Sequence, residues 1–144
     1  MTPNPGDPGC TCYRLRQTAR LVTRTYDRFL APADISIGQF GMLSTLEAME
    51  GKSISELADV LQMERTTLTR NLSPLKKLRY IAIAEGPDRR AKSLRLTKAG
   101  EKALSSAKPL WRAAQQSLEQ QLGKAEVKSL ARTLDSVMER LSEN

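Results

Sequence analysis

The chain has 144 residues, 40% of them hydrophobic but only 4% aromatic, so its core must be filled by aliphatic and small side chains. Its net charge of +7 favours a polyanionic partner, because each phosphate that a lysine or arginine neutralises releases counterions. The chain has no histidine, which removes the commonest metal ligand and the commonest general base. No apolar run is long enough to span a membrane.

Residues 1–9 are rich in proline and glycine, and we expect a flexible tail there rather than a signal peptide. From about Cys12 to Leu30 apolar residues recur at alternating spacings of four and three, which predicts a helix with one heptad-like face. We interpret 10–35 as a dimerisation helix. The residues of its apolar face are Leu15, Ala19, Val22, Tyr26 and Phe29.

Three further helices follow in the chain. Ser36 with Gln39 and Ser53 with Glu56 have the spacing of capping boxes, so a helix should begin at each serine. The third of these helices is expected over 65–79, after a tight turn, and this pair has the outline of a helix-turn-helix. Its inner face consists of Leu68, Leu72, Leu75 and Leu78.

The pattern then changes to the period of strands. Residues 81–85 and 92–96 read as two short strands, and the segment Gly86-Pro87-Asp88 between them supplies a turn. A hairpin directly after the second helix of a helix-turn-helix is a wing. We therefore expect 36–97 to be a winged helix-turn-helix DNA-binding domain.

Two helices complete the chain. Thr97 should cap a long helix that runs to about Leu122, and Gly123 should end it. We interpret 98–144 as C-terminal dimerisation helices. The expected fold class is mainly α with a small β-hairpin, a winged helix-turn-helix with N- and C-terminal dimerisation helices. The last helix has a second heptad-like face of Val127, Leu130, Leu134, Val137 and Leu141.

The charge is concentrated where DNA would bind. Residues 53–97 hold nine basic and five acidic residues, a surplus of four positive charges. Arg70 lies opposite the leucines of its helix, where it could form paired hydrogen bonds to guanine in a major groove. Arg89 and Arg90 at the wing tip suit a minor groove, with Asp88 holding a nearby arginine by a salt bridge. The alternatives, a solvated helix face and an ordinary charged hairpin, are less favoured beside a capped helix and a wing.

The first predicted helix carries a row of arginines at four-residue spacing. Such a row is most often a solvated face. The other interpretation is a pocket for a small anionic ligand beneath this helix, and the residues alone leave both open. The row consists of Arg16, Arg20, Arg24 and Arg28.

Four segments in succession resemble the MarR family of transcriptional regulators, over nearly the whole chain from Cys10 to Leu141. The resemblance implies an obligate homodimer that places a recognition helix and a wing on each half of a palindromic operator. It also implies that Arg90 is the wing arginine and Asp88 its salt-bridge partner, beside which Arg89 and Lys92 are candidate DNA contacts. The segments are Ser53-Ile54-Ser55-Glu56-Leu57-Ala58, Arg65-Thr66-Thr67-Leu68-Thr69-Arg70, Asp88-Arg89-Arg90-Ala91-Lys92 and Leu96-Thr97-Lys98-Ala99-Gly100. The implied major-groove residues are Arg65, Thr66, Thr67, Thr69 and Arg70.

The sequence departs from the family pattern around the recognition helix. Glu64 stands where aspartate usually caps that helix, and glutamate is a weaker cap. Pro74 falls inside the helix and removes one backbone hydrogen bond. Tyr80 stands at the usual glycine position at its end. These departures put the tilt of the helix in doubt but not the fold.

Family members are commonly released from DNA by small aromatic or phenolic ligands, or by oxidation. Cys12 falls where the peroxide-sensing OhrR branch carries its reactive cysteine, and Tyr26 falls on one of the tyrosines of that branch. The other two tyrosine positions hold Arg16 and Ile37, so the set is incomplete. A cysteine at a helix start near arginines is a candidate for oxidation, with Cys10 as the candidate resolving thiol. Ligand release, thiol oxidation and a merely incidental cysteine all stay open.

The expected function is that of a cytoplasmic, homodimeric DNA-binding regulator, most often a repressor in this family. An enzyme is disfavoured because no catalytic set can be assembled without histidine, a phosphate-binding loop or clustered carboxylates. A winged helix can also serve as a protein-docking module, but the basic recognition face speaks against that. No cofactor or metal is expected. The close spacing of the two cysteines favours a reducing compartment.

Overall fold

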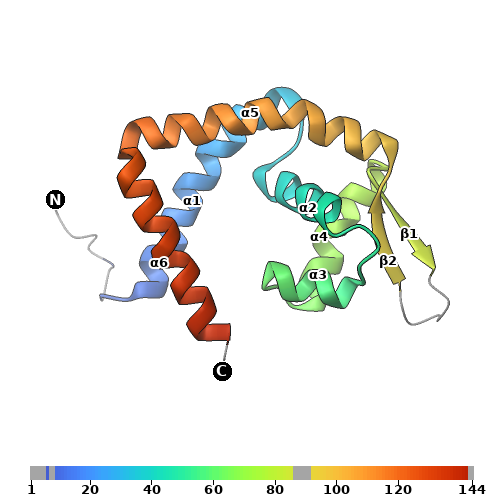
Figure 1. The fold of residues 1–144 in the computed structure, drawn as a ribbon, viewed down its shortest axis with the longest axis horizontal. Coiled ribbons are helices and arrows are strands. Elements are labelled where there is room, and N and C mark those ends of the chain that lie inside the picture. The colour runs from blue at the N-terminus through green and yellow to red at the C-terminus, as the bar shows by residue number, and fades with distance from the viewer. Residues whose placement is uncertain (1–5, 7–8, 86–91, 143–144) are drawn as a thin grey trace.

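The structure, a computed structural model, describes residues 6, 9–85 and 92–142. Most of the predicted tail, and the wing turn with Asp88, Arg89 and Arg90, lie outside the described residues. In chain order the elements are α1 (Thr11–Leu30), the 3₁₀ helix η1 (Ala31–Ala33), α2 (Ile37–Ala48), α3 (Ile54–Leu61), α4 (Arg65–Lys77), β1 (Ile81–Glu85), β2 (Lys92–Leu96), α5 (Lys98–Leu122) and α6 (Lys124–Ser142) (Figure 1).

The helix starts follow local signals in the sequence. Ser36 Oγ accepts the N–H of Gln39 at 3.1 Å, and Gln39 Oε1 accepts the N–H of Ser36 at 3.0 Å. Ser53 and Glu56 form the same reciprocal pair, each bond 3.2 Å long. Hydrogen bonds to the Glu56 carboxylate, first from the backbone N–H of Ser53 and second from its side chain, lower the pKa of that carboxyl. Both predicted capping boxes are confirmed, and each pairs donors that a bare helix start would leave open.

The core lies where α2, α3, α4 and the hairpin meet the first half of α5. It is built almost entirely from aliphatic side chains, and Leu43, Leu75 and Leu104 are completely buried in it. Phe40 of α2 stacks on Trp111 of α5 with ring centroids 5.8 Å apart. The winged unit is therefore packed against the long helix rather than joined to it by a loose linker.

The antiparallel hairpin pairs Ile81 with Leu96 and Ile83 with Leu94, so these side chains share one face of the hairpin. Beyond it, α5 begins directly on the end of α4. Thr97 Oγ1 donates a hydrogen bond to the carbonyl of Arg79 at 2.6 Å and accepts the N–H of Gly100 at 3.1 Å, which confirms Thr97 as the cap of α5. This junction holds α4, the hairpin and α5 as one unit.

Helices α1, α5 and α6 form an arm that extends away from the winged unit (Figure 1). The hydroxyl of Tyr26 in α1 donates a hydrogen bond to Gln115 Oε1 in α5. Gly123, with φ of 90°, ends α5 as predicted, and α6 turns back from it. No residue of α6 is buried. Over the described residues, every helix is too short or too polar to span a membrane.

One interior prediction is wrong, and one core residue was missed. Leu78 is 45% exposed because α4 ends at Lys77, one residue before the fourth leucine would complete its inner face. Leu30 is completely buried although it lies outside the predicted heptad-like face of α1. It joins the core of the winged unit at the end of α1, a contact that the spacing within one helix cannot indicate.

Candidate DNA-binding interface

Helix α4 presents a polar face on the side away from its buried leucines. Leu68, Leu72 and Leu75 are buried, which turns the opposite side toward solvent. Of the five predicted major-groove residues, Thr67 alone is partly buried. The exposed ones are Arg65, Thr66, Thr69 and Arg70.

The two ends of α4 are held differently. The side chain of Glu64 makes no capping hydrogen bond, so the first turn depends on packing. At the other end, the N–H of Tyr80 donates to the carbonyl of Leu75 and the N–H of Arg79 to that of Lys76, each at 3.0 Å. This is a Schellman motif whose left-handed residue is Arg79, with φ of 61°. The family pattern has its usual glycine at the position of Tyr80. In this chain the left-handed residue is one position earlier, at Arg79.

The wing is described only in its two strands. Glu85 pairs with Lys92 at the open end of the hairpin, which places Lys92 beside the wing turn. The side chains of these two residues, and all of Asp88, Arg89 and Arg90, lie outside the described part of the chain. Their predicted roles at a minor groove stay predictions.

The arginine row on α1 is exposed, and two of its members border a pocket. This pocket has a volume of about 530 Å³ and is lined by Leu21, Arg24, Thr25, Asp27 and Arg28. Asp27 is already engaged, because its Oδ1 accepts the N–H of Ile37 at 2.7 Å. The described lining therefore offers two cations, one apolar side chain and one carboxylate, of which one oxygen is bonded to the backbone of α2.

The two cysteines lie at the very start of α1. Cys10 is the N-cap residue, and its Sγ accepts the N–H of Tyr13 at 3.5 Å. Both Cys10 and Cys12 are exposed, and neither forms a disulfide. The predicted position of Cys12 in the first turn is confirmed.

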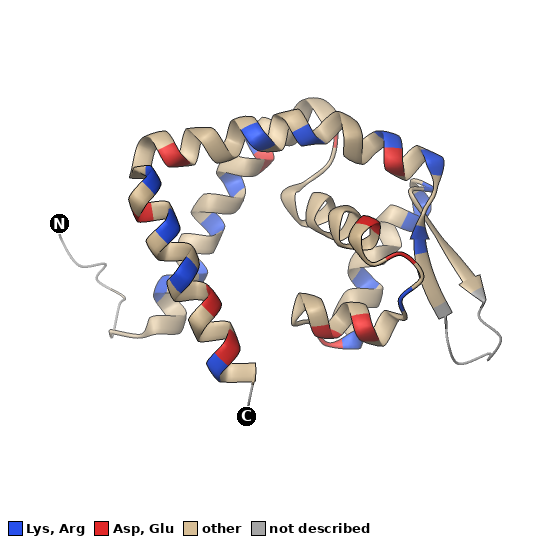
Figure 2. Cartoon of the chain, viewed as in Figure 1, with Lys and Arg blue, Asp and Glu red and all other residues tan. Residues whose placement is uncertain are grey.

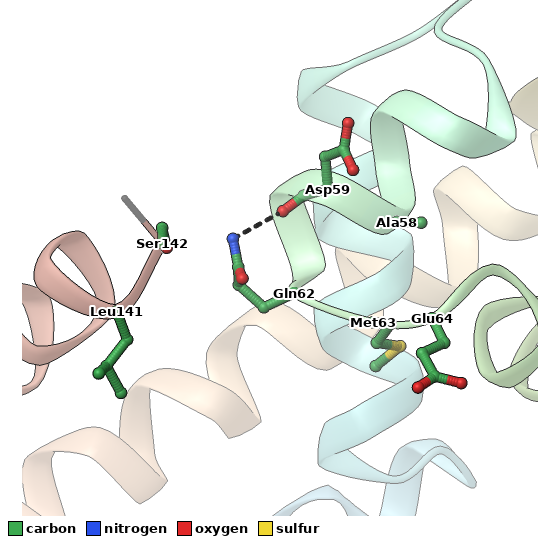
Figure 3. Close-up of a pocket in the computed structure, with 7 residues that line it drawn as sticks. All are labelled: Ala58, Asp59, Gln62, Met63, Glu64, Leu141 and Ser142. Carbon is green, nitrogen blue, oxygen red and sulfur yellow. Dashed lines mark hydrogen bonds between the residues drawn. The ribbon is translucent and has the colours of Figure 1, made fainter. Parts of the chain in front are cut away.

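A second pocket lies between the end of the arm and the winged unit (Figure 3). It has a volume of about 500 Å³ and lies between the end of α6, with Leu141 and Ser142, and the turn from α3 to α4. In that turn Gln62 has φ of 53° and its amide donates to the carbonyl of Asp59 at 3.0 Å. Nothing in the sequence signalled that these segments face one pocket, because they lie about eighty residues apart.

Sequence reasoning also missed a third concave feature, a groove between the start of α2 and the flank of α4. It has a volume of about 290 Å³ and includes Arg70, the predicted base-reading residue. The signal that could have indicated it is Gly38, an exposed glycine in the first turn of a well-capped helix. The groove residues are Ser36, Gly38, Gln39, Met42, Met63, Arg70, Asn71 and Pro74.

The basic residues are concentrated on particular elements of the ribbon. Figure 2 shows basic residues along α1 and on α4 and β2, whereas α6 carries both signs. No group of three or more histidine, cysteine or acidic side chains within the described ranges could hold a metal ion. The described surface thus offers cationic helices for an anionic partner.

The comparisons with known proteins decide the family. A profile of the MarR family matches residues 33–91. The crystal structure of the transcriptional regulator MosR of M. tuberculosis in complex with DNA is 34% identical, with a TM-score of 0.80, over 92% of this chain and 98% of that chain. The chain belongs to the MarR family. It is a DNA-binding transcriptional regulator with a winged helix-turn-helix fold, and not an enzyme.

Other relatives agree on the class of protein. YwoH of Bacillus subtilis (strain 168), an uncharacterized HTH-type transcriptional regulator, is 28% identical over 90 residues, which are 62% of this chain and 66% of YwoH, just under two thirds. The transcriptional repressor CouR bound to a 23-mer DNA duplex is 25% identical, with a TM-score of 0.82, over 95% of this chain and 99% of that one. CouR bound to p-coumaroyl-CoA, at 22% identity, a TM-score of 0.79, and 94% and 97% coverage, shows the fold alone.

Proposed function

We propose that this MarR-family regulator is a homodimeric repressor that binds a palindromic operator with one recognition helix and one wing per half-site. The observation that carries the proposal is the exposed polar face of α4, fixed by three buried leucines on its other side. The exposed, cation-bearing helix is set to enter a major groove, whose width matches a helix. The proposed DNA contacts are Arg65, Thr66, Thr67, Thr69 and Arg70 of α4 and Arg89, Arg90 and Lys92 of the wing, with Asp88 as the salt-bridge partner.

The first test removes one cation from each reading element. Arg70→Ala should relax base preference at one position of each half-site and weaken operator binding by about 1–3 kcal/mol. Arg90→Ala should weaken binding with little change in major-groove preference, because a minor groove distinguishes bases poorly. Binding is measured by fluorescence anisotropy on operator variants selected from genomic DNA. Arg112→Ala, which removes an exposed cation from α5, is the control. Unchanged affinity in both test variants would exclude this mode of docking.

Homodimerisation is supported by the arm. The predicted apolar face of α6 is exposed, with Leu130, Leu134 and Val137 all more than a third accessible in the single chain. Tyr26 of the α1 face is buried against α5, but Leu15 of that face and the whole α6 face exceed what the core of the chain covers. A second copy presents the same apolar residues in return. We infer that residues 10–35 and 98–144 form the dimerisation unit and 36–97 the DNA-binding domain.

Release by a small aromatic or phenolic ligand is the control mechanism that we favour. The pocket on α1 supports it, because Arg24 and Arg28 can hold an anionic group while Leu21 contacts an apolar one. A solved structure has the repressor CouR bound to p-coumaroyl-CoA, a ligand that combines an aromatic acyl group with phosphates. Arg24→Ala and Arg28→Ala should weaken release of operator DNA by p-coumaroyl-CoA at least tenfold, whereas Arg16→Ala, on the same row but outside the pocket, should not. Equal responses in all three would exclude this site.

Thiol-based control is the second candidate, and the exposure of both cysteines at the start of α1 supports it. A peroxide would oxidise the Cys12 thiol to sulfenic acid and be reduced to an alcohol or water. A second thiol would then displace water from the sulfenic sulfur and form a disulfide. A bond between residues two apart in one chain is strained, so Cys10 of the other subunit is the better partner. Peroxide should release wild-type protein from operator DNA but leave Cys12→Ser bound. Release of both proteins, or of neither, would exclude the thiol mechanism.

A further inference from the structure

The groove between α2 and α4 borders the recognition face. Arg70 belongs to both, since it is exposed on α4 and lines the groove together with Asn71 and Pro74. The opposite wall is the first turn of α2, with Ser36 and Gln39. The α2–α4 groove thus continues the exposed face of α4 that would enter the major groove of DNA. It lies to one side of that face.

The groove walls hold side-chain donors that the fold does not use. Ser36 Oγ and Gln39 Oε1 accept backbone hydrogen bonds in the capping box, so the Ser36 hydroxyl hydrogen and the Gln39 amide hydrogens remain available. Arg70 adds a guanidinium with five N–H donors, so two can pair with a guanine while the others remain for a phosphate. Two of the first backbone N–H groups of α2 are already paired, because Asp27 accepts the N–H of Ile37 and Ser36 accepts that of Gln39. An anion in the groove would therefore be held mainly by side chains.

Duplex DNA would bring such an anion to this place. A helix about 10–12 Å across nearly fills a major groove about 12 Å wide, so the flanks of the helix face the phosphates on either side. A diester phosphate accepts hydrogen bonds and carries one negative charge. These properties match the three donor side chains of the groove, of which one, Arg70, is cationic.

We propose that the α2–α4 groove receives a phosphate of the operator backbone on one flank of the recognition helix, held by Ser36, Gln39 and Arg70. This inference rests on the proposed DNA-binding role and adds a contact outside α4 and the wing. Such a contact fixes the position of α4 in the major groove without reading sequence. It acts equally on operator and on unrelated duplex DNA.

Two glycines on α2 allow a matched test. Gly38 lines the groove, and a Cβ there would have its nearest neighbour, Ser36 Oγ, at 3.8 Å. Gly41, one turn later, does not line the groove, and a Cβ there would meet nothing within 4 Å. A side chain can therefore begin at either position without a clash at its Cβ, on the same helix and with the same added charge.

Gly38→Lys should tighten binding to operator and to unrelated duplex alike, several-fold, and Gly38→Glu should weaken both by a similar factor. Each added phosphate contact steepens the slope of log K against log salt concentration by about 0.9. Between 50 and 200 mM salt, the fold-loss of affinity of Gly38→Lys should therefore be about threefold greater than that of wild type. Gly41→Lys should show neither change. The measurement is a salt titration of anisotropy with both duplexes.

Two results would overturn the proposal while leaving the DNA-binding role intact. The first is a Gly38→Lys protein that behaves like Gly41→Lys, and the second is a Gly38→Glu protein with wild-type affinity. Wild-type protein that binds no duplex DNA in a salt-dependent manner would instead contradict the proposed function itself. Circular dichroism of the variants separates loss of folding from loss of the phosphate contact.

Discussion

Gly100 shows how one residue sets the position of α4 relative to α5. A Cβ built at this position would lie 2.1 Å from the carbonyl oxygen of Tyr80, which is far inside van der Waals contact. The N–H of Thr97 donates to that same carbonyl at 3.0 Å. The first turn of α5 therefore rests on the backbone that immediately follows α4, and only glycine permits this approach.

We expect Gly100→Ala to lower the free energy of unfolding by about 3 kcal/mol. The added methyl group would force α5 away from Tyr80 and break the hydrogen bonds of Thr97. Gly41→Ala is the matched control, since it adds a methyl group to a helix at a place with open space. It should stabilise the protein by about 0.5–1 kcal/mol through helix propensity. Urea unfolding followed by circular dichroism measures both. Equal shifts of the midpoint in the two variants would show that the close approach to Tyr80 has no cost.

At the scale of elements, what could be predicted depended on how local the signal is. The capping boxes at Ser36 and Ser53, and the cap at Thr97, were correctly predicted because each involves a side chain and a backbone group three residues apart. The end of α4 was less accurate. The left-handed residue is Arg79. Because this chain has Tyr80 at the position where the family usually has glycine, the sequence does not indicate which residue adopts that conformation.

The candidate site shows the same division. The exposed face of α4 followed from the spacing of its leucines, which is a property of one helix. The groove beside it could not be predicted, since Ser36 and Arg70 lie 34 positions apart and meet only through packing of two helices. The pocket between Leu141 and Gln62 likewise joins distant segments. Periodicity indicates which side of a helix is apolar but not which other element covers it.

Tyr26 gives a test of the contact between α1 and α5. Its hydroxyl donates to Gln115, and Tyr26→Phe should cost about 0.5–1.5 kcal/mol because the hydrogen bond is lost and the amide keeps an unpaired oxygen. Burial, and second the nearby Glu119 carboxylate, raise the pKa of Tyr26 above its ordinary value of 10.0. Thermal unfolding with a pH series measures both effects.

The sign of the pH effect follows from the direction of that shift. The unfolded chain releases the phenolic proton first as pH rises past about 10, so the contribution of Tyr26 to stability is complete below that pH and falls as pH rises through the folded pKa. Wild type should therefore lose stability above pH 10 more steeply than Tyr26→Phe. Parallel curves for the two proteins would contradict a buried, carboxylate-facing phenol.

For the whole molecule, the arm is the part that a single chain leaves incomplete. The winged unit encloses its own core, whereas α6 has no buried residue and exposes Leu130, Leu134, Val137 and Leu141 by 37–69%. On α1, Leu15 is 44% exposed although it begins the heptad-like face. A contiguous exposed apolar row such as the one on α6 marks an interaction surface, because a solvated helix does not need it. Two copies that pair these rows would also set two recognition helices at a fixed separation on DNA.

Placing a charge in the row on α6 tests this arrangement. Leu134→Glu should abolish dimerisation, because the partner would have to bury an unpaired carboxylate in an apolar seam. Tight operator binding should be lost with it, since a monomer grips only one half-site. Ser129→Glu is the matched control: it adds the same charge to the same helix, at an exposed position on the opposite side from Leu134, and should leave a dimer with wild-type affinity. Light scattering at micromolar concentration measures the molar mass of each protein. Fluorescence anisotropy measures its affinity for the whole operator and for a single half-site. A Leu134→Glu protein that stays dimeric, or a wild-type monomer that still binds the palindrome tightly, would show that the exposed row of α6 is not the dimer seam.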